Sequence, residues 1–179
     1  RKALEPYTSE LEILFEEVDC SFPNHEADPT VEKNLMKLKA RVQNSGAELG
    51  LAFDGDGDRI GLVSSSGRVL WGDEILMLLS QKVLKTHSGA SIIGEVKCSE
   101  KLFQFISKAG GHPVMYRTGH SLIKNKMKEL QAPLAGEMSG HMFFADRYFG
   151  FDDAIYAGLR ILEVVAELNL DIDQWIRSF

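Results

Sequence analysis

Short apolar runs alternate with amphipathic stretches along the chain, which is the pattern of strands that alternate with helices. Apolar or alternating runs predict strands at 11–15, 49–53, 60–63, 69–70, 91–96, 113–116, 134–136 and 142–144. Helical spacing of apolar residues predicts helices at 30–46, 73–86, 99–109, 121–130 and 152–168, and residues 1–9 have the pattern of a helix end. This alternation indicates an α/β fold in which layered helices cover mixed, largely parallel sheets.

The segment His87–Ala90 is the strongest candidate for a linker, and the strand–helix pattern restarts directly after it. We therefore expect two consecutive α/β domains, residues 1–88 and residues 89–179. In the first of them, Thr30 is expected to cap a helix and Gly46 to end it. Residues 19–29 contain two prolines and predict a loop.

Composition and charge narrow the function classes. The 179 residues include 20 Lys and Arg against 26 Asp and Glu, a net charge of −6, and 44% are apolar, which excludes wholesale disorder. The acidic balance argues against a general nucleic-acid or membrane-surface binder. The apolar run 75–79 is far too short to cross a bilayer, and no signal-peptide pattern follows Arg1. Because Cys20 and Cys98 lie far apart with no CxxC spacing, we expect a reducing, cytoplasmic setting.

The segment Phe53–Arg59, which contains the aspartate loop (residues 54–59), carries the most specific chemistry. Asp54, Asp56 and Asp58 follow a predicted strand at alternate positions, and the glycines between them let the loop curl so that the carboxylates converge. Three like charges at close range need a cation, and oxygen ligands favour Mg²⁺ or Ca²⁺. The plainer alternative is a glycine-rich hairpin loop with solvated acids.

Several functions fit such a loop. An EF-hand is rejected, because it requires Gly and Glu where this chain has Arg59 and Ser65. A phosphatase of the haloacid-dehalogenase type stays open, with Asp54 as nucleophile and Asp56 as general acid and base. Two features argue against such a phosphatase. Asp58 stands where that family usually has Thr, and the motif follows a strand–helix unit instead of lying on the first strand. A non-catalytic module that binds a divalent cation or a sugar phosphate is the third alternative.

Arg59 could neutralise the three carboxylates or pair with a phosphate that bridges to the metal, and neither role belongs to a calcium buffer.

A second loop, which we call the sugar loop (residues 137–141), also follows a predicted strand. It places Glu137, Ser139 and His141 at alternate positions, an arrangement suited to adjacent hydroxyls of a sugar. Taken alone, this loop is equally compatible with an ordinary turn at a strand end.

The two loops together resemble the α-D-phosphohexomutase superfamily, and within it the bacterial phosphomannomutase/phosphoglucomutase branch. The motifs are Asp54-Gly-Asp-Gly-Asp-Arg59 and Gly136-Glu-Met-Ser-Gly-His141, and further similar segments occur in the family's order at 22–25, 96–98, 118–124 and 149–153. The combination is specific and extends over nearly the whole chain.

The resemblance implies an intramolecular phosphotransferase of carbohydrate metabolism, which interconverts hexose 1-phosphate and hexose 6-phosphate. An active-site phosphoserine donates its phosphate and gives a bisphosphorylated sugar that reorients and returns the other phosphate. Mannose and glucose phosphates are the expected substrates, with glucose 1,6-bisphosphate as activator and intermediate. Phosphoglucosamine mutases more often carry Gln where this chain has Met138, and the preferred sugar stays open.

The family's functional residues carry over position by position. Those expected to bind Mg²⁺ are Asp54, Asp56 and Asp58, with Arg59 as the partner of the phosphoserine. Residues expected to contact the substrate are Lys97, His120, Glu137, Ser139 and His141. The resemblance implies that Lys97, His120 and His141, together with Arg59, are catalytic, and a histidine is suited to proton transfer.

Several polar residues near these motifs are assigned a structural role or none. Asp152 and Asp153 are expected to be acids at a helix N-terminus, where the dipole favours them. Lys124, Lys126 and Lys128 are expected to form a solvated helix face. We assign no role to His25, His87 or His112. A helix cap is the alternative for His120, and a solvated loop lysine is the alternative for Lys97.

The family's nucleophile lies in a loop similar to Ser-His-Asn-Pro, and no Ser-His pair occurs in these 179 residues. A phosphate-binding loop rich in Arg, Ser and Thr is also missing. The resemblance therefore implies a fragment that corresponds to most of domain 2 plus domain 3 of a four-domain enzyme. Without domains 1 and 4, we expect this fragment to be inactive alone.

Overall fold

The computed structural model describes residues 1–17 and 19–179. Eight strands lie at β1 Leu49–Phe53, β2 Ile60–Ser64, β3 Val69–Leu70, β4 Ser91–Glu95, β5 His112–Tyr116, β6 Leu134–Gly136, β7 Met142–Phe144 and β8 Phe151–Asp152. Six α-helices lie at α1 Met36–Ser45, α2 Gly72–Thr86, α3 Glu100–Lys108, α4 His120–Leu130, α5 Ala154–Leu168 and α6 Ile172–Arg177. Two short 3₁₀ helices cover Glu5–Tyr7 and Glu32–Leu35.

The first sheet has the order β1-β2-β3 and is antiparallel throughout. The expectation of largely parallel sheets is wrong for this part of the chain. The connections that join the three strands span residues 54–59 and 65–68, and loops this short permit only antiparallel neighbours. The aspartate loop is therefore the turn of a β-hairpin.

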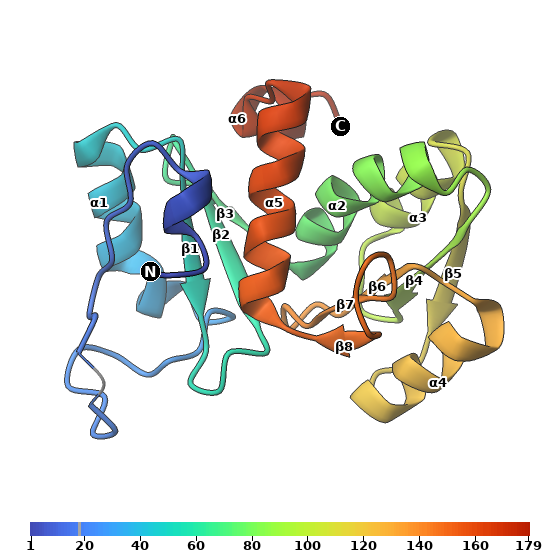
Figure 1. Cartoon of the computed structure of the whole chain (residues 1–179), viewed down its shortest axis with the longest axis horizontal. Helices are drawn as coiled ribbons and strands as arrows, with labels where there is room; N and C mark the ends of the chain where they lie inside the picture. The colour runs from blue at the N-terminus through green and yellow to red at the C-terminus, as the bar shows by residue number, and fades with distance from the viewer. Residues whose placement is uncertain (18) are drawn as a thin grey trace.

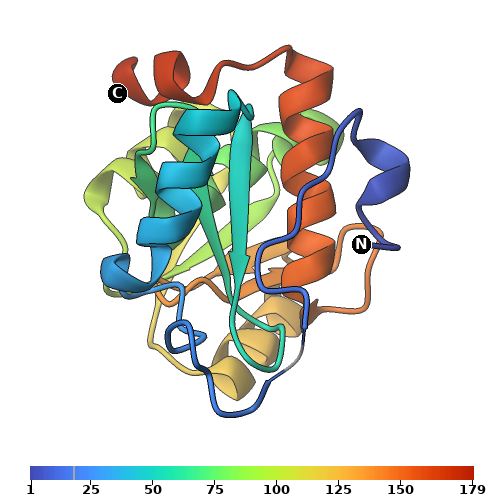
Figure 2. The ribbon, with the colours of Figure 1, turned by 90° about the vertical axis from the view of Figure 1, so that its left-hand side faces the viewer.

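Strand β2 is apolar along its whole length because both of its faces are covered. Leu62 points into a core with α2 and α5, while its neighbour Val63 packs with Val42 of α1 on the opposite face. Helix α1 lies across that outer face of the sheet (Figure 2). It ends at Gly46, as predicted, in the left-handed conformation with φ of 73°.

The second sheet has the order β5-β4-β6-β7-β8. Strand β4 pairs in parallel with β5 and β6, and the later pairs β6–β7 and β7–β8 are antiparallel. Ile92 and Ile93 show how this sheet is covered: Ile92 packs in the core with α2 and α3, and Ile93 packs with Ile123 of α4. Helices therefore cover both faces of the sheet.

The two sheets share one continuous apolar core. Ile60 and Leu62 of the first sheet belong to the same buried cluster as Ile92 and Leu134 of the second. Helix α5 stands between the two sheets, and α2 contacts β2, β4 and β6 (Figure 1). Helix α2 thus packs mainly with elements of the second sheet, although the predicted boundary after residue 88 assigns it to the first domain.

Several elements differ from the sequence expectations. Residues 11–15 form no strand, because they have no neighbouring strand to complete their backbone hydrogen bonds. Residues 1–9 contain only the short turn Glu5–Tyr7, and Thr30 bonds to Asp28 instead of capping a helix. Strand β8 and helix α6 were not predicted. Among the described residues, no helix combines the length and apolar character needed to cross a membrane.

Candidate functional site

The candidate site lies where the β1–β2 hairpin meets the carboxyl ends of β4 and β6. Strands β5 and β6 lie on opposite sides of β4, so the connections after these strands diverge at this edge. Such a switch point is where α/β sheets usually bind their ligands. The sugar loop follows β6, and the segment 117–120 follows β5.

Asp54 organises the aspartate loop from its base. Its Oδ1 accepts backbone N–H groups of Gly57, Asp58 and Arg59 at 3.0–3.1 Å, and its Oδ2 accepts Nε of Arg59 at 2.8 Å. The side chain is only 1% exposed. Burial by itself would raise the pKa of Asp54, but these hydrogen bonds favour the carboxylate and lower the pKa to about 2.

The three aspartates converge as the sequence predicts. One carboxylate oxygen from each of Asp54, Asp56 and Asp58 lies within 4.8 Å of the other two. Burial and the neighbouring Asp54 raise the pKa of Asp58, which is the response expected when like charges gather. The donor set consists only of oxygen atoms, the set that Mg²⁺ and Ca²⁺ prefer.

Arg59 binds two carboxylates within the chain. Besides Asp54, its Nη1 contacts Oδ1 of Asp28 at 3.2 Å. Asp28 was not recognised from the sequence, because it lies in the long loop 19–29 and its partner is 31 residues away. The two acids hold the guanidinium at the edge of the aspartate loop.

Glu137 is the buried centre of the sugar loop. Its Oε1 accepts the backbone N–H of Gly119 at 2.8 Å, and its Oε2 lies 3.2 Å from Nδ1 of His141. The hydroxyl of Ser139 contacts the same Nδ1 at 2.8 Å. Burial opposes charge on both partners. Their mutual hydrogen bond and attraction, together with the Gly119 N–H at Glu137 and the charge of Asp58 at His141, outweigh burial, so the pKa of Glu137 is lowered and that of His141 is raised.

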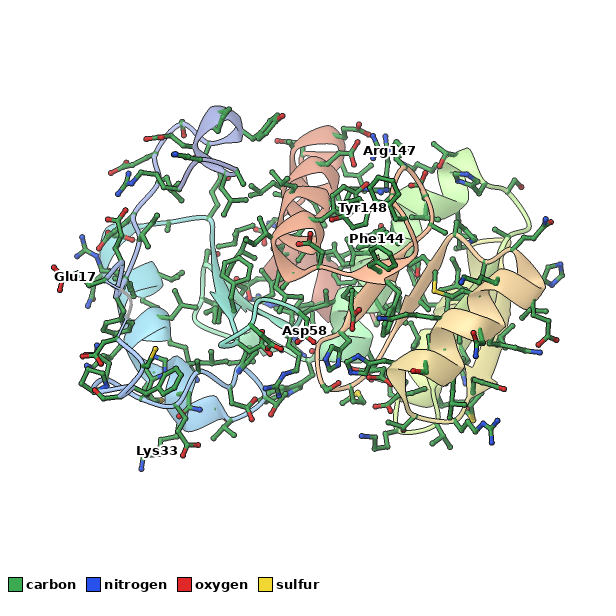
Figure 3. All side chains as sticks on the ribbon, turned by 60° about the horizontal axis from the view of Figure 1, so that its bottom comes forward. Glu17, Lys33, Asp58, Phe144, Arg147 and Tyr148 are labelled. Carbon is green, nitrogen blue, oxygen red and sulfur yellow. The ribbon has the colours of Figure 1, made fainter. Side chains whose placement is uncertain are left out.

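The two loops meet directly. Nε2 of His141 lies 3.3 Å from Oδ1 of Asp58, and the backbone N–H of Ile60 donates to the carbonyl oxygen of Gly140 at 3.1 Å. Figure 3 places Asp58 where the two halves of the molecule adjoin. A hollow at this junction is lined by Asp56, Gly57, Asp58, Tyr148, Phe151, Asp152, Asp153 and Ile155.

His120 and Asp152 complete the junction, and here the sequence expectations need correction. Asp152 does not begin a helix: it lies in β8 opposite Phe143, and its carboxylate contacts Nδ1 of His120 at 2.9 Å and Nζ of Lys124 at 2.7 Å. Lys124 is therefore an ion-pair partner of Asp152 and not part of a solvated face. Asp153 alone caps α5, as predicted for it, by accepting the N–H of Tyr156.

Lys97 lies at the margin of the site. It is 60% exposed, and its Nζ lies 3.3 Å from Oε1 of Glu95. The same oxygen accepts the N–H of Met138 in the sugar loop at 2.9 Å, and Oε2 accepts the hydroxyl of Thr118. Glu95 is fully buried at the end of β4 and was missed, since one acidic residue at a strand end carries no sequence signal.

Comparisons with known proteins match both parts of the chain to one family. The family described as phosphoglucomutase/phosphomannomutase, alpha/beta/alpha domain II matches residues 2–67, and domain III of the same family matches residues 71–179. A phosphomannomutase/phosphoglucomutase from Pseudomonas syringae pv. tomato is 51% identical over 176 residues, which are 98% of this chain and 38% of the relative. A phosphoglucomutase from Neisseria meningitidis serogroup A is 49% identical over 158 residues, or 88% of this chain and 34% of the relative.

Solved structures give the same result. A phosphoglucomutase/phosphomannomutase family protein from Burkholderia thailandensis superposes with a TM-score of 0.87 at 47% identity, over 92% of this chain and 36% of that one. An N-acetylphosphoglucosamine mutase from Aspergillus fumigatus, solved in complex with GlcNAc-6P and magnesium, shares the fold at a TM-score of 0.60 and 16% identity, over 72% of this chain and 32% of that one. The chain thus spans little more than a third of the length of its relatives.

Proposed function

Because the chain belongs to the phosphoglucomutase/phosphomannomutase family, we propose that it supplies the metal-binding and sugar-binding loops of an enzyme that interconverts hexose 1-phosphate and hexose 6-phosphate. The observation that carries the proposal is the direct contact of the two loops through Asp58 and His141 at 3.3 Å. A phosphate bound at the aspartate loop would therefore lie within reach of a sugar held by the second loop. The names of the relatives support mannose and glucose phosphates as substrates.

The aspartate loop fits a Mg²⁺ ion. Its three carboxylates converge, and Asp56 is exposed and ready to bind. Asp54 retains a lone pair on Oδ2 beside Arg59, since a carboxylate has about four acceptor sites. When bound, Mg²⁺ would withdraw charge from a transferring phosphoryl group. We propose Asp54, Asp56 and Asp58 as its ligands.

The chain's own residues have separate proposed tasks. Arg59, fixed by Asp28 and Asp54, would pair with the phosphoserine phosphate. Glu137 and Ser139 would bind sugar hydroxyls, and Lys97 would contact the substrate from the margin of the site.

His120 and His141 would hold or move the proton of the reacting hydroxyl. Their ring centres lie 4.0 Å apart. Both imidazoles therefore lie where one sugar hydroxyl could contact either of them.

The phosphatase alternative is weakened by the surroundings of Asp54. A nucleophile needs an accessible oxygen, but Oδ1 of Asp54 already accepts three backbone N–H groups and the side chain is almost fully buried. We propose that Asp54 is a positioning and metal-binding residue. Beryllofluoride would trap a phospho-aspartate analogue on Asp54 if the phosphatase alternative were correct, and Asp54→Asn would then abolish hydrolysis.

We propose that the 179 residues are a part of a longer enzyme. They span 34–38% of the relatives named above, and they contain no Ser-His pair to supply the phosphoserine loop. We further propose, as an alternative to the boundary after residue 88, a domain boundary near residue 71, between β3 and α2. This boundary is supported by the packing of α2 and by the gap between the two family matches.

The decisive experiment is a titration of the chain followed by ¹H–¹⁵N NMR. Mg²⁺ should shift the amide signals of Gly55 and Gly57, and glucose 1-phosphate added afterwards should shift those of Gly119 and Gly140. Asp56→Asn should weaken the Mg²⁺ response, whereas Asp171→Asn, remote from the loop, should leave it unchanged. Failure of glucose 1-phosphate to shift either glycine would overturn the assignment of the sugar loop.

A mutase assay tests the fragment proposal separately. With Mg²⁺ and glucose 1,6-bisphosphate present, the 179-residue chain should convert hexose 1-phosphate only at the background rate. Turnover well above that rate would show that the chain carries its own phosphate donor.

A further inference from the structure

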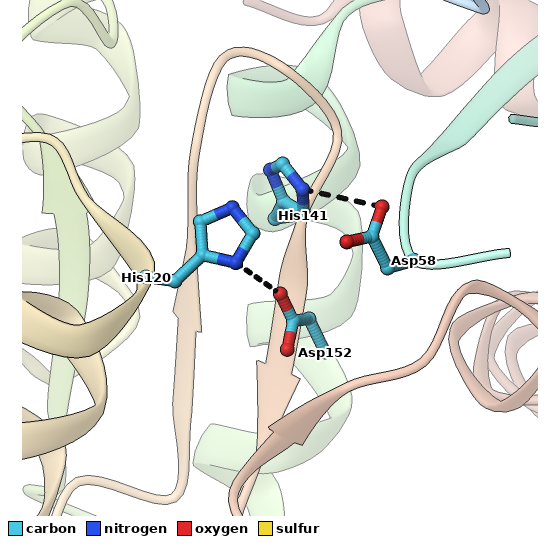
Figure 4. Close-up of side chains that lie close together, drawn as sticks. All are labelled: Asp58, His120, His141 and Asp152. Carbon is cyan, nitrogen blue, oxygen red and sulfur yellow. Dashed lines mark ion pairs between the residues drawn. The ribbon is translucent and has the colours of Figure 1, made fainter. Parts of the chain in front are cut away.

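Four side chains from four separate segments point toward one another beside the aspartate loop (Figure 4). We call them the histidine–aspartate cluster: Asp58, His120, His141 and Asp152. One ligand atom from each lies within 4.8 Å of every other. The segments are the aspartate loop, the start of α4, the sugar loop and β8, so the cluster exists only in the folded chain.

The cluster differs in chemistry from the three aspartates. It offers two imidazole nitrogens and two carboxylate oxygens, a donor set that suits Zn²⁺ and similar transition metals better than Mg²⁺. A tetrahedral zinc ion with bonds of about 2.0–2.2 Å separates its donor atoms by roughly 3.4 Å. The contacts His120–Asp152 at 2.9 Å and His141–Asp58 at 3.3 Å are close to that spacing.

A second observation points to a cation. The Asp152 side chain is 7% exposed, and among the residues that the structure describes its Oδ2 is a buried oxygen without a hydrogen-bond partner. Nδ1 of His120 lies 2.9 Å from this oxygen and forms an ion pair with it when the imidazole is protonated, while Oδ1 is bound by Lys124. An unsatisfied buried carboxylate oxygen is costly, and a metal ion at the centre of the cluster would satisfy it.

The surrounding contacts already orient the ligands. Ser139 and Glu137 hold Nδ1 of His141, which leaves its Nε2 facing Asp58. A carboxylate behind a histidine is the usual arrangement around protein-bound zinc. Two carboxylates in the cluster also balance the charge of a divalent ion.

We propose that the histidine–aspartate cluster is a second metal site, selective for Zn²⁺ or a similar transition metal, which adjoins the proposed Mg²⁺ site and shares Asp58 with it. The proposal rests on the cluster itself and holds whether or not the proposed reaction is correct. A metal bound here would occupy the two histidines that we assign to the substrate. If the proposed function holds as well, Zn²⁺ is an inhibitor of sugar binding.

The test is metal binding to the 179-residue chain in excess Mg²⁺. Calorimetry with Zn²⁺ should show one strong site, and Co²⁺ should give the visible absorption of a tetrahedral complex with nitrogen ligands. Asp152→Asn and His120→Gln should each weaken Zn²⁺ binding about tenfold or more. Asp153→Asn, a neighbour whose capping role Asn also performs, is the matched control and should bind Zn²⁺ normally.

A variant of the aspartate loop, Asp56→Asn, should give the opposite result: weaker Mg²⁺ binding with unchanged Zn²⁺ binding. The proposal is overturned if Zn²⁺ does not bind, or if Asp56→Asn weakens Zn²⁺ binding while Asp152→Asn and His120→Gln do not. Circular dichroism checks that each variant is folded, and His120→Gln is the safer variant because its side chain is 41% exposed.

Discussion

The backbone N–H of Ile60 donates to the carbonyl oxygen of Gly140 and thereby joins the β1–β2 hairpin to the sugar loop. This contact needs a residue without a side chain at position 140. A Cβ there would lie 2.5 Å from the carbonyl oxygen of Ile60, and the φ of 94° is one that other residues rarely adopt. The relative position of the two loops therefore depends on one glycine.

Gly140→Ala should lower the free energy of unfolding by about 1–3 kcal/mol, since both backbone strain and a clash with backbone atoms oppose it. Thermal or urea unfolding measures the loss. Gly46→Ala is the matched control, because Gly46 has a φ of 73° but no atom within 4 Å of its would-be Cβ. Equal losses in the two variants would show that the contact with Ile60 adds nothing.

Asp173 should stabilise the chain in a pH-dependent way. From α6 it accepts the hydroxyls of Ser64 and Ser66 at 2.7 Å and the N–H of Ser66 at 3.0 Å, so it fastens the β2–β3 turn to the C-terminal helix. Burial would raise the pKa of Asp173, but these hydrogen bonds outweigh it and lower the pKa below 3.8. Asp173→Asn should cost about 1–3 kcal/mol at neutral pH.

The sign of the pH effect follows from the lowered pKa. The carboxylate of Asp173 stabilises the fold fully above its unfolded pKa, and this contribution is lost as the pH falls through that value toward the folded pKa. The difference in unfolding free energy between the wild type and Asp173→Asn should therefore shrink below about pH 4. Asp171→Asn, which retains a capping side chain on α6, should differ little from the wild type at any pH.

Arg160 should tolerate replacement poorly. It is buried in α5 and donates to the carboxylate of Asp146 at 2.6 Å and to the Asp146 carbonyl oxygen at 3.1 Å. Arg160→Met removes the close partner of a buried carboxylate, whose next basic groups, Arg147 and His87, lie 3.9 and 4.0 Å away, and should lower the free energy of unfolding by about 3–5 kcal/mol. Arg147→Met removes a neighbouring arginine that is 55% exposed and should cost at most about 1 kcal/mol. Similar melting temperatures for the two variants would contradict this assignment.

The two cysteines should differ in reactivity toward iodoacetamide. Cys20 is exposed, whereas Cys98 is buried, and burial with the nearby charges of Asp73 and Glu95 raises the pKa of its thiol to about 12. Because the thiolate is the reactive form, mass spectrometry of the native chain should show a single adduct, on Cys20. Cys20→Ser should give none until the chain is unfolded. A native adduct on Cys98 would show that its surroundings open readily.

The sequence alone predicts those parts of the site in which several residues of one motif share a loop. Asp54, Asp56 and Asp58 alternate after an apolar strand, and the sugar loop likewise follows its strand directly. Their positions follow from local geometry, and the structure brings them together as expected.

The remaining site residues depend on tertiary structure. Asp28, Glu95 and Asp152 are single acids, and each has a partner in the site far along the chain: Arg59 is 31 residues from Asp28, Met138 is 43 from Glu95 and Lys124 is 28 from Asp152. Asp152 also precedes Asp153, so the pair resembles the start of a helix. Only the pairing of β8 with β7 separates the two residues into a strand end and a helix cap.

Prediction of the strands from the sequence is limited in the same way, because it does not show which segments have a partner strand. Strands β1, β4 and β6 are clear from their apolar runs, whereas residues 11–15 have a strand-like pattern without a partner strand. Strand propensity alone does not make a strand, because its backbone groups need neighbours. Strand β8 is the opposite case. Its two residues carry no strand pattern in the sequence, but they form a strand because β7 lies beside them and completes their backbone pairing.

The continuous core also limits how such chains exchange segments during evolution. Ile60 and Leu62 of the hairpin are buried in the same cluster as Leu134 and Phe144 of the other sheet. A hairpin acquired from a distant relative would insert foreign side chains into an interior that is packed about as densely as a crystal. Recombination within this core would require compensating substitutions in α2 and α5, so the two sheets are expected to be inherited together.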